Sequence, residues 1–480
     1  MFVLDISLAQ WTATKSIGYT RMSTNHPLSI DPCALTKIGE FTEGLLSCYL
    51  LSNEDTSLAA SMEIEVFESS YRDWNRRRFI KLAVMLPVSA SLAHFRLLAQ
   101  SQAKQVKITG ISAMALNNIA GNSLIRVDTD SGLTGYGEAG ATGPMARARI
   151  ETIKPLLLGK DPLEIEVHFQ QMSSMMYNYM AHIPTVSGID IALWDLAGKI
   201  LGRSVKELLG GGFREEIAMY SHGIGVDLLD KASCRAWAQR IRSMPEGFTV
   251  FKCDAHNVVR LPSGVYANTL TTSQLRDMRT AYENAREAVG NDIDIAVHCH
   301  GEFDTLSSIG IAKAVAPMNP LWIEDPMPPV FSEGWVALRR SNNLTLLTGE
   351  KLELVRGFRP FLDNQVVDII HPDLAFAGGI TGTKKIADFA ALSRTPVALH
   401  NVGSLVLTYA NAHFAASIQN FYKSESALGR EGHHIEGMAA TNPPVVRGGM
   451  LKVPNGPGLG LDLSEDFLRK NLMPGETYWS

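Results

Sequence analysis

Ionisable residues recur at the ends of successive apolar segments in the second half of this 480-residue sequence. The segments read "FTVFKCD", "IAVHCH", "LWIED", "TLLTGE", "DIIHPD" and "PVALH". Intervals of 26, 26, 23 and 27 residues separate His298, Glu324, Glu350, Asp373 and His400. Each interval suits one strand followed by one helix. A parallel barrel brings the C-terminal ends of its strands to one mouth, so we expect these groups to converge there.

The segment "DIAVHCH" ends in two histidines separated by one cysteine. If residues 293–300 form a strand, alternation places His298 and His300 on one face and Cys299 on the other. The pair alone is compatible with a metal ligand beside an acid, with two acids, or with a hydrogen-bonded structural pair. The rest of the sequence has to decide between them.

Composition places the chain among globular proteins of two or three domains, because 45% of its residues are hydrophobic and 19% are charged. The net charge of −5 comes without a long run of like charge, so nucleic acid is not an expected partner. The five cysteines show no CxxC or zinc-like spacing. No disulfide framework is predicted.

Residues 76–103 have the pattern of an export signal. Arg76, Arg77 and Arg78 precede "FIK" and a modestly apolar run that is too short to span a bilayer. The order Arg-Arg-x-Phe-Ile-Lys resembles a twin-arginine signal, which predicts export to a bacterial periplasm without stable membrane insertion. An amphipathic helix with a basic start is the alternative, and an unused signal would leave the protein cytoplasmic.

Residues 1–75 form an extension before this signal without a periodic pattern. Met62 is a candidate true start, because translation from it would leave a short polar segment, "MEIEVFESSYRDWN", before the arginines. Cleavage after Ala90, Ala99 or Ala103 would suit the small-residue rule equally well. The sequence leaves the start and the cleavage site open.

Residues 104–225 predict an α+β domain. "VKITGISAMAL" and "NSLIRVDTDSGLTGYGEAG" have the character of antiparallel strands, with a turn at residues 130–132. "IDIALWDLAGKILGRSVKELLG" follows with apolar residues at helical spacing, and residues 210–212 supply a glycine stop.

Five motifs occur in order at characteristic spacing: "GIDIALWDLAGK", "WIEDP", "TGEKL", "HPDLAFAGGITGTKKIA" and "ALHNVGS". Between about residue 107 and residue 460 the chain resembles the mandelate racemase and muconate lactonizing branch of the enolase superfamily, and it is similar to its galactonate dehydratase-like members. The resemblance implies an α/β fold with a modified (β/α)7β TIM-type barrel at residues 226–429. An α+β capping domain at 104–225 would cover it, and residues 430–480 would return to the cap.

The resemblance also implies a divalent metal site. In this family a base removes a proton α to a carboxylate, and the cation stabilises the resulting enediolate. The matching ligand positions are His298, Glu324 and Glu350. Mg²⁺ is the expected ion, but His298 stands where the family has aspartate. Weaker Mg²⁺ binding, a preference for Mn²⁺, Fe²⁺ or Zn²⁺, and loss of the metal together with activity are therefore the alternatives.

The family's base corresponds to His400, oriented by Asp373 so that one imidazole nitrogen is free to take a proton. Where many relatives carry Lys-x-Lys on the second strand, this chain has Lys252, Cys253 and Asp254. A carboxylate at position 254 cannot act as an ammonium acid, which disfavours a two-base racemase.

The histidine pair of the third strand takes its meaning from the same resemblance. The acid-sugar dehydratases end this strand in Asp-x-His-Gly, so His300 matches the acid for the leaving hydroxyl and His298 the metal ligand. Glu425 resembles the glutamate of the eighth strand. The candidate catalytic residues are His400, Asp373, His300, Lys252, Asp254 and Glu425.

The resemblance therefore predicts a carbon–oxygen lyase that dehydrates a sugar acid to a 2-keto-3-deoxy acid. A racemase or epimerase of a hydroxy acid on the same barrel is one alternative, in which Asp254 or Lys252 would exchange the α-proton. A non-catalytic protein that binds acid sugars is another. The expected partner is a small-molecule sugar acid selected by residues 177–182 and 255–272, and a homo-oligomer is expected.

Overall fold

The computed structural model describes residues 106–479 except 118, 120, 175–181, 224, 261–267, 429–434, 442 and 445. The expected N-terminal extension and export signal therefore lie outside the described residues, as do most of residues 177–182. No helix among the described residues combines the length and apolar character that crossing a bilayer requires.

The described chain opens with a cap made of an antiparallel sheet and helices. Its strands pair in the order β1, β2, β3, which confirms the antiparallel sheet expected from the sequence. Helix α6 packs closely on β3 because Gly137 has no side chain, and a Cβ there would lie 2.0 Å from the Gly188 carbonyl oxygen. The cap elements are β1 (Ile108–Ala115), β2 (Ser123–Thr129), β3 (Thr134–Ala139), α4 (Gly143–Leu157), α5 (Ile165–Ser173), α6 (Ile183–Leu201) and α7 (Val205–Leu208).

The helix expected to reach the glycines at 210–212 is two helices. Gly202 ends α6 in the left-handed conformation with φ 63°. Ser204 then caps α7 by accepting a hydrogen bond from the Glu207 amide, while the Glu207 side chain bonds back to Ser204. This capping box restarts the helix in a new direction.

Eight parallel strands form a closed barrel, because β11 pairs with β4 as well as with β10. The strands are β4 (Glu216–His222), β5 (Val250–Asp254), β6 (Asp294–His298), β7 (Ile323–Glu324), β8 (Leu346–Thr348), β9 (Ile369–Ile370), β10 (Val397–Leu399) and β11 (Phe421–Glu425). The first barrel strand thus begins at Glu216, ahead of the boundary expected at residue 226. A strand that starts the barrel cannot be told from a cap strand by its own alternation, and its pairing with β5 and β11 assigns it.

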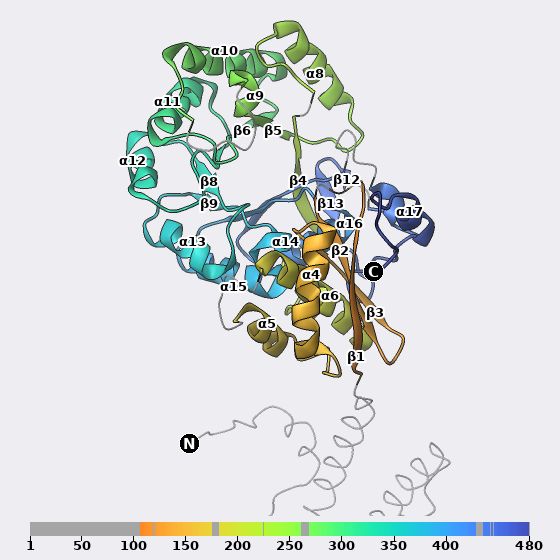
Figure 1. Cartoon of the computed structure of the whole chain (residues 1–480). Helices are drawn as coiled ribbons and strands as arrows, with labels where there is room; N and C mark the ends of the chain where they lie inside the picture. Colours follow the sequence, from red (N-terminus) through yellow and green to blue (C-terminus); the bar gives the residue numbers. More distant parts are fainter. Residues whose placement is uncertain are drawn as a thin grey trace, which may run out of the picture. The chain divides into compact units, whose positions relative to one another are not determined.

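Helices follow the first seven strands, and Figure 1 shows α8 and α10 to α13 along the periphery of the barrel, with the short α9 nearer to β5 and β6. Amphipathic spacing explains their packing: in α10 the buried residues include Met278, Ala281, Tyr282 and Ala285, and Thr271 caps the helix. The helices are α8 (Lys231–Ser243), α9 (Ala255–Val259), α10 (Thr272–Val289), α11 (Thr305–Val315), η2 (Ala316–Met318), α12 (Glu333–Ser341), α13 (Leu354–Asp363), α14 (Leu374–Ala377), α15 (Gly379–Leu392) and α16 (Leu405–Ser417). This arrangement is the predicted (β/α)7β barrel.

One layer of apolar side chains fills the barrel interior. Tyr220 and Trp322 meet edge to face in it, with ring centroids 5.2 Å apart. The layer comprises Tyr220, Val250, Ala296, Trp322, Leu347, Ile369 and Ala398, one residue from or beside each of seven strands. It closes the barrel below the mouth.

The C-terminal segment contacts both the barrel and the cap. β13 extends the sheet beside β4 in the antiparallel sense, and Leu472 forms a β-bridge with Leu116. Glu476 accepts two hydrogen bonds from Arg147 of α4, at 2.6 and 2.8 Å. The elements of this segment are η3 (Glu436–Met438), β12 (Val446–Arg447), β13 (Met450–Lys452) and α17 (Glu465–Lys470).

Candidate active site

The ionisable groups of the barrel mouth follow the apolar interior layer by two residues. Because side chains alternate along a strand, an inward-facing core residue predicts another inward-facing residue two positions later. The residues in this second layer are His222, Lys252, His298, Glu324, His371 and His400. The mouth is therefore a continuation of the core pattern with polar side chains.

His298, Glu324 and Glu350 bring one potential ligand atom each to the same point. His298 Nε2 lies 3.4 Å from Glu324 Oε1 and 3.4 Å from Glu350 Oε2, and all three residues are buried. Burial opposes protonation of His298, yet Glu324 and then Glu350 outweigh it and raise its pKa to about 10. The two buried carboxylates therefore strongly favour a positive charge at this point.

The unpaired atoms of this triad fit a cation. His298 Nε2 and Glu350 Oε2 are buried, and neither makes a hydrogen bond within the described part of the chain. Unsatisfied buried polar atoms are costly, and two oxygen donors with one imidazole nitrogen form a donor set for a divalent ion. Trp322 Nε1 donates to the other Glu324 oxygen at 3.0 Å, which ties that ligand to the core layer.

His400 and Asp373 form a short hydrogen-bonded pair. His400 Nδ1 and Asp373 Oδ2 are 2.6 Å apart, and the carboxylate is fully buried. Asp373 Oδ1 also accepts the Ala375 amide at the start of α14, which fixes the carboxylate. His400 Nε2 points to Glu350 Oε2 at 3.3 Å. The free nitrogen therefore faces the candidate cation site.

Lys252 is an ammonium between two carboxylates. Its Nζ donates to Glu324 Oε1 at 3.0 Å and to Glu425 Oε2 at 2.9 Å. Burial opposes the charge, but Glu324 and Glu425 outweigh it and hold the pKa of Lys252 well above its ordinary value. Tyr220 donates to the same Glu425 oxygen at 3.3 Å. Lys252 is thus placed as a charge partner for the site.

His300 is not on the strand that carries His298. The expected strand over residues 293–300 ends at His298, because His300 adopts a left-handed conformation with φ 53° and Lys351 Nζ donates to its carbonyl oxygen at 3.0 Å. The two rings nevertheless lie close together, with centroids 3.6 Å apart and ring planes tilted by 31°. Burial and then His298 lower the pKa of His300 to about 3. Burial, with the neighbouring His298 as the second cause, therefore favours a neutral His300.

Asp254 lies on the opposite side of His298 from the two glutamates. Its Oδ1 is 3.0 Å from His222 Nε2 and 3.3 Å from His298 Nδ1. Burial opposes ionisation, but contacts with His222 and His298 hold the pKa of Asp254 well below its ordinary value. It is a carboxylate among imidazoles.

Two mouth histidines were missed from the sequence. His222 ends β4 and bonds to Asp254, and His371 lies 3.2 Å from the Tyr220 hydroxyl and 3.4 Å from Glu324 Oε1. Both could have been found by counting two residues on from Tyr220 and Ile369, had the core layer been recognised. The motif "HPD" indicated Asp373, and the histidine that begins it was not among the predicted site residues.

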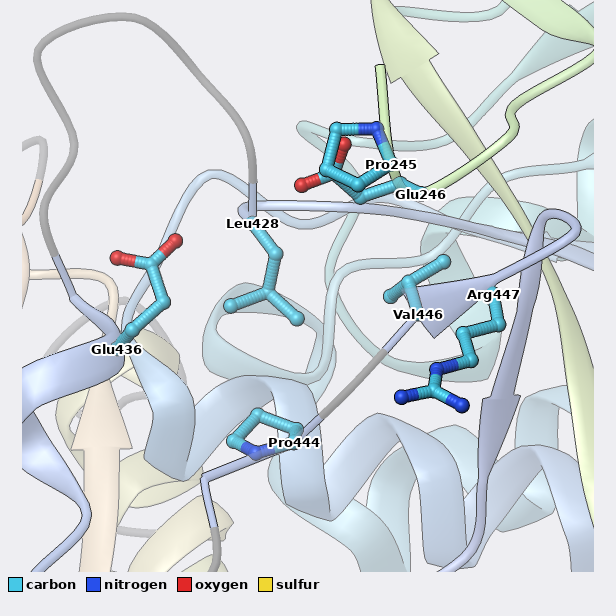
Figure 2. Close-up of a pocket in the computed structure, with 7 residues that line it drawn as sticks. All are labelled: Pro245, Glu246, Leu428, Glu436, Pro444, Val446 and Arg447. Atoms are coloured by element: carbon cyan, nitrogen blue, oxygen red, sulfur yellow. The ribbon is translucent and has the colours of Figure 1, made fainter.

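Two pockets lie outside this cluster or at its edge. Figure 2 shows one of about 240 Å³, where Leu428 and Val446 lie between Glu436 and Arg447, and none of its lining residues belongs to the mouth cluster. A second, of about 370 Å³, adjoins the site through Asp254 and extends to Asn257 and Arg260. Part of the expected loop 255–272 lines it, although Ala255–Val259 is helical. Residues 261–267 of that loop lie outside the described residues.

Comparisons with known proteins identify the family of the described fold. Residues 102–210 match the family model of the mandelate racemase / muconate lactonizing enzyme N-terminal domain, and residues 234–467 match the enolase C-terminal domain-like model. The D-xylonate dehydratase of Haloferax volcanii is 33% identical, over 74% of this chain and 86% of the relative. The D-gluconate dehydratase of Thermoproteus tenax is 30% identical, over 72% and 69%. Among solved structures, a mandelate racemase/muconate lactonizing enzyme-like protein from Rubrobacter xylanophilus has a TM-score of 0.72 and 30% identity, over 78% of this chain and 100% of that one.

Proposed function

The chain belongs to the enolase superfamily, in the group of mandelate racemase and muconate lactonizing enzymes, and from this membership we propose that it is a lyase that dehydrates a sugar acid to a 2-keto-3-deoxy acid. The dehydratases of D-xylonate and D-gluconate among its relatives support the reaction class. The substrate would be a sugar acid with a hydroxyl on the carbon next to the α-carbon.

The main observation behind the proposal is that Glu350 lies between His298 of the candidate cation site and the candidate base His400. Its Oε2 lies 3.4 Å from His298 Nε2 and 3.3 Å from His400 Nε2. A carboxylate substrate held at the triad would therefore have its α-carbon beside the free nitrogen of His400. Proximity of this kind is what α-proton abstraction requires.

Members of this superfamily use a divalent metal, and His298, Glu324 and Glu350 would hold it here. The ion would supply positive charge against the negative charge that develops on the substrate carboxylate. Burial opposes protonation of His400, but Glu350 and Glu425 raise its pKa, so engagement of Glu350 as a ligand favours the neutral base. Mg²⁺ is the first candidate, and Mn²⁺, Fe²⁺ and Zn²⁺ suit the imidazole better.

The other mouth residues divide the remaining tasks. Asp373 holds the His400 tautomer, and His300 would give a proton to the departing hydroxyl. A neutral His298, as a ligand must be, removes the second of the causes that lower the pKa of His300, while burial remains the first. Lys252 and Glu425, which are hydrogen-bonded to each other, would contribute one positive and one negative charge next to the bound substrate.

Two other functions compete with dehydration. Racemisation or epimerisation would need a second base opposite His400, and Lys252 is bound as an ammonium between Glu324 and Glu425. Binding of an acid sugar without turnover would need no ordered His400–Asp373 pair. Both therefore account for fewer of the contacts in the mouth.

A library of sugar acids tests the proposal, with Mg²⁺, Mn²⁺ and Zn²⁺ supplied in turn to the purified protein. We expect a 2-keto-3-deoxy product from at least one acid and none from the same protein with His400→Asn. Exchange of the α-proton with inversion and no 2-keto product would establish the racemase instead. Saturable binding of an acid without exchange or product would establish the binding protein. Sedimentation of the same sample tests the expected homo-oligomer.

A further inference from the structure

One oxygen of Asp254 faces three imidazole rings. Oδ1 is 3.0 Å from His222 Nε2, 3.3 Å from His298 Nδ1 and 4.0 Å from His300 Nε2. The Asp254 side chain is only 14% exposed, so water contributes little to its solvation. The carboxylate therefore depends on these rings for compensation of its charge.

The His298 ring lies between Asp254 and the candidate cation site. Its Nε2 faces Glu324 and Glu350, whereas its Nδ1 faces Asp254. Neither ring nitrogen makes a hydrogen bond within the described residues, and both are buried. An imidazole that gives one nitrogen to a cation must carry its proton on the other, and a carboxylate at that second nitrogen fixes the tautomer.

The charge of the triad makes this contact significant. Two carboxylates and one neutral imidazole carry one negative charge less than three carboxylates would. Asp254 lies next to the ring that accounts for the difference. Lys252, bound to Glu324, and Lys351, bound to Glu350, add positive charge on the other side.

We propose that Asp254 is a positioning residue for the cation site. It holds the Nδ1–H tautomer of His298 and so presents Nε2 toward Glu324 and Glu350. Its negative charge, acting through the His298 ring, compensates for the carboxylate ligand that the histidine replaces. The inference rests on the proposed function only in taking His298, Glu324 and Glu350 as the cation site. Ligation by Nε2 should shorten the contact between Nδ1 and Asp254 to a hydrogen bond. In this role Asp254 acts on His298 and not on the substrate.

His222 provides a matched control for this role. It is the other close partner of Asp254, at 3.0 Å, and it is not a member of the group of His298, Glu324 and Glu350. It forms a separate possible metal group with Asp254 and His298, and the substitution His222→Gln tests that group directly. If Asp254 served only to pair with His222, then His222→Gln and Asp254→Asn would alter the protein equally. Under our proposal they differ, because only Asp254 acts on the ligand ring.

Titration calorimetry with Mn²⁺ alone, on the full chain, tests the proposal without any substrate. We expect one Mn²⁺ per chain, and we expect Asp254→Asn to weaken its affinity about 10–100-fold, the usual cost of losing such a partner. His222→Gln should weaken it less than about threefold, and Asp254→Glu should recover part of the loss. Thermal melting of each variant without metal checks that the fold is kept.

A double-mutant cycle separates positioning from a general structural role. In the His298→Asp background no ring remains to be oriented, so adding Asp254→Asn should change Mn²⁺ affinity less than about threefold. Pulsed electron paramagnetic resonance should detect a ¹⁴N coupling to Mn²⁺ in the parent, an altered coupling in Asp254→Asn and none in His298→Asp.

Three results would overturn the inference: no Mn²⁺ binding by the parent, an equal loss from Asp254→Asn in both backgrounds, or a single bound Mn²⁺ that is lost with His256→Gln or with His222→Gln. The last would place the cation among Asp254, His256 and His300, or among His222, Asp254 and His298, instead of at the triad. Failure of every sugar acid to react, with the Mn²⁺ results as expected, would reject the proposed function and leave this inference standing. Dehydration of a sugar acid by the parent, together with an Mn²⁺ affinity that Asp254→Asn leaves unchanged, would support the proposed function and reject this inference.

Discussion

At the scale of single residues, the site depends on which nitrogen of each histidine carries a proton. Asp373 assigns Nδ1 of His400 through a contact of 2.6 Å, and Asp254 approaches Nδ1 of His298 at 3.3 Å. In both rings Nε2 then faces Glu350, at 3.3 and 3.4 Å. Two carboxylate–imidazole pairs thus point their free nitrogens at one shared acidic group.

The first prediction concerns the base. His400→Asn keeps a polar side chain of similar size but has no group that can accept the α-proton, so exchange of that proton with deuterium should fall at least about 10³-fold. Exchange followed by proton magnetic resonance, with bound Mn²⁺ measured in parallel, checks this. Retained exchange would move the base elsewhere, with Lys252 the next residue to substitute.

The second prediction separates the paired histidines. His298→Ala should lower Mn²⁺ affinity, and His298→Asp should shift preference toward Mg²⁺ because an oxygen ligand suits that ion. His300→Asn should leave metal affinity nearly unchanged while slowing dehydration roughly 10²–10⁴-fold, since it removes only the acid. Exchange at the α-carbon should persist in His300→Asn, because abstraction uses His400. Equal metal affinity in His298→Ala and the parent would leave His298 as a structural ring.

Residue type and spacing could predict the strand-end groups, because strand alternation fixes which side chains face inward. They could not predict the turn at His300, whose left-handed backbone is stabilised by Lys351 from another strand end. His222 and His371 were not predicted as site residues for a related reason. Their importance lies in contacts with Asp254 and Glu324, which are distant in sequence.

At the scale of secondary-structure elements, α6 joins the cap to the barrel through buried polar groups. Asp190 of α6 accepts the Thr381 amide of α15 at 2.9 Å, and its other oxygen is buried without a hydrogen bond in the described part of the chain. Burial raises the pKa of Asp190 to about 7, although bonds to Thr381 oppose this. The helix contact therefore favours a protonated carboxyl group.

The third prediction follows from that protonation. The unfolded chain loses the Asp190 proton near pH 4 and the folded chain keeps it until about pH 7, so folding takes up a proton in between and stability falls as pH rises across this window. Asp190→Asn cannot ionise and should lack this fall, gaining roughly 2–4 kcal/mol on the parent between pH 4 and pH 8. Urea unfolding at several pH values measures it, and parallel curves for the two proteins would contradict the assignment.

Motif spacing predicted the barrel units, whereas element boundaries needed tertiary pairing. β4 is assigned to the barrel by its bonds to β5 and β11, and its own alternation is equally suited to the cap sheet. The break between α6 and α7 depends on Gly202, a residue that a helix often tolerates.

At the scale of the whole molecule, the predicted export signal at residues 76–103 lies outside the described residues. We propose that Arg76 and Arg77 direct export, and the fourth prediction is that Arg76→Lys with Arg77→Lys retains the protein in the cytoplasm. Arg78→Lys, at the variable position of the motif, is the matched control and should leave export unchanged. Cell fractionation that finds all three proteins in one compartment would remove the proposal.

The C-terminal segment meets the cap through contacts that no local pattern predicts, since the Arg147–Glu476 pair spans 329 residues. The Glu476 side chain is 7% exposed, and it also accepts the Ala115 amide at 3.1 Å. A two-point bond between a carboxylate and a guanidinium is among the stronger polar contacts of a protein. Glu476 therefore fastens the end of the described chain to β1 and α4.

The fifth prediction is that Glu476→Gln lowers the free energy of unfolding by about 1–2 kcal/mol, because the neutral amide loses a charge-assisted bond to Arg147. The matched control is Glu465→Gln in α17, whose 60% exposed side chain pairs with Arg469 and should change stability by less than about 0.5 kcal/mol. The bond to Arg147 lowers the pKa of Glu476, so the unfolded carboxylate takes up a proton at higher pH than the folded one does. The contribution is then complete above the unfolded pKa and is lost as pH falls through the folded pKa. Urea unfolding at pH 7 and in acid tests both parts. The difference in free energy of unfolding between the parent and Glu476→Gln should become smaller on acidification. An equal effect of the two substitutions would show that the C-terminal contact adds nothing beyond an exposed ion pair.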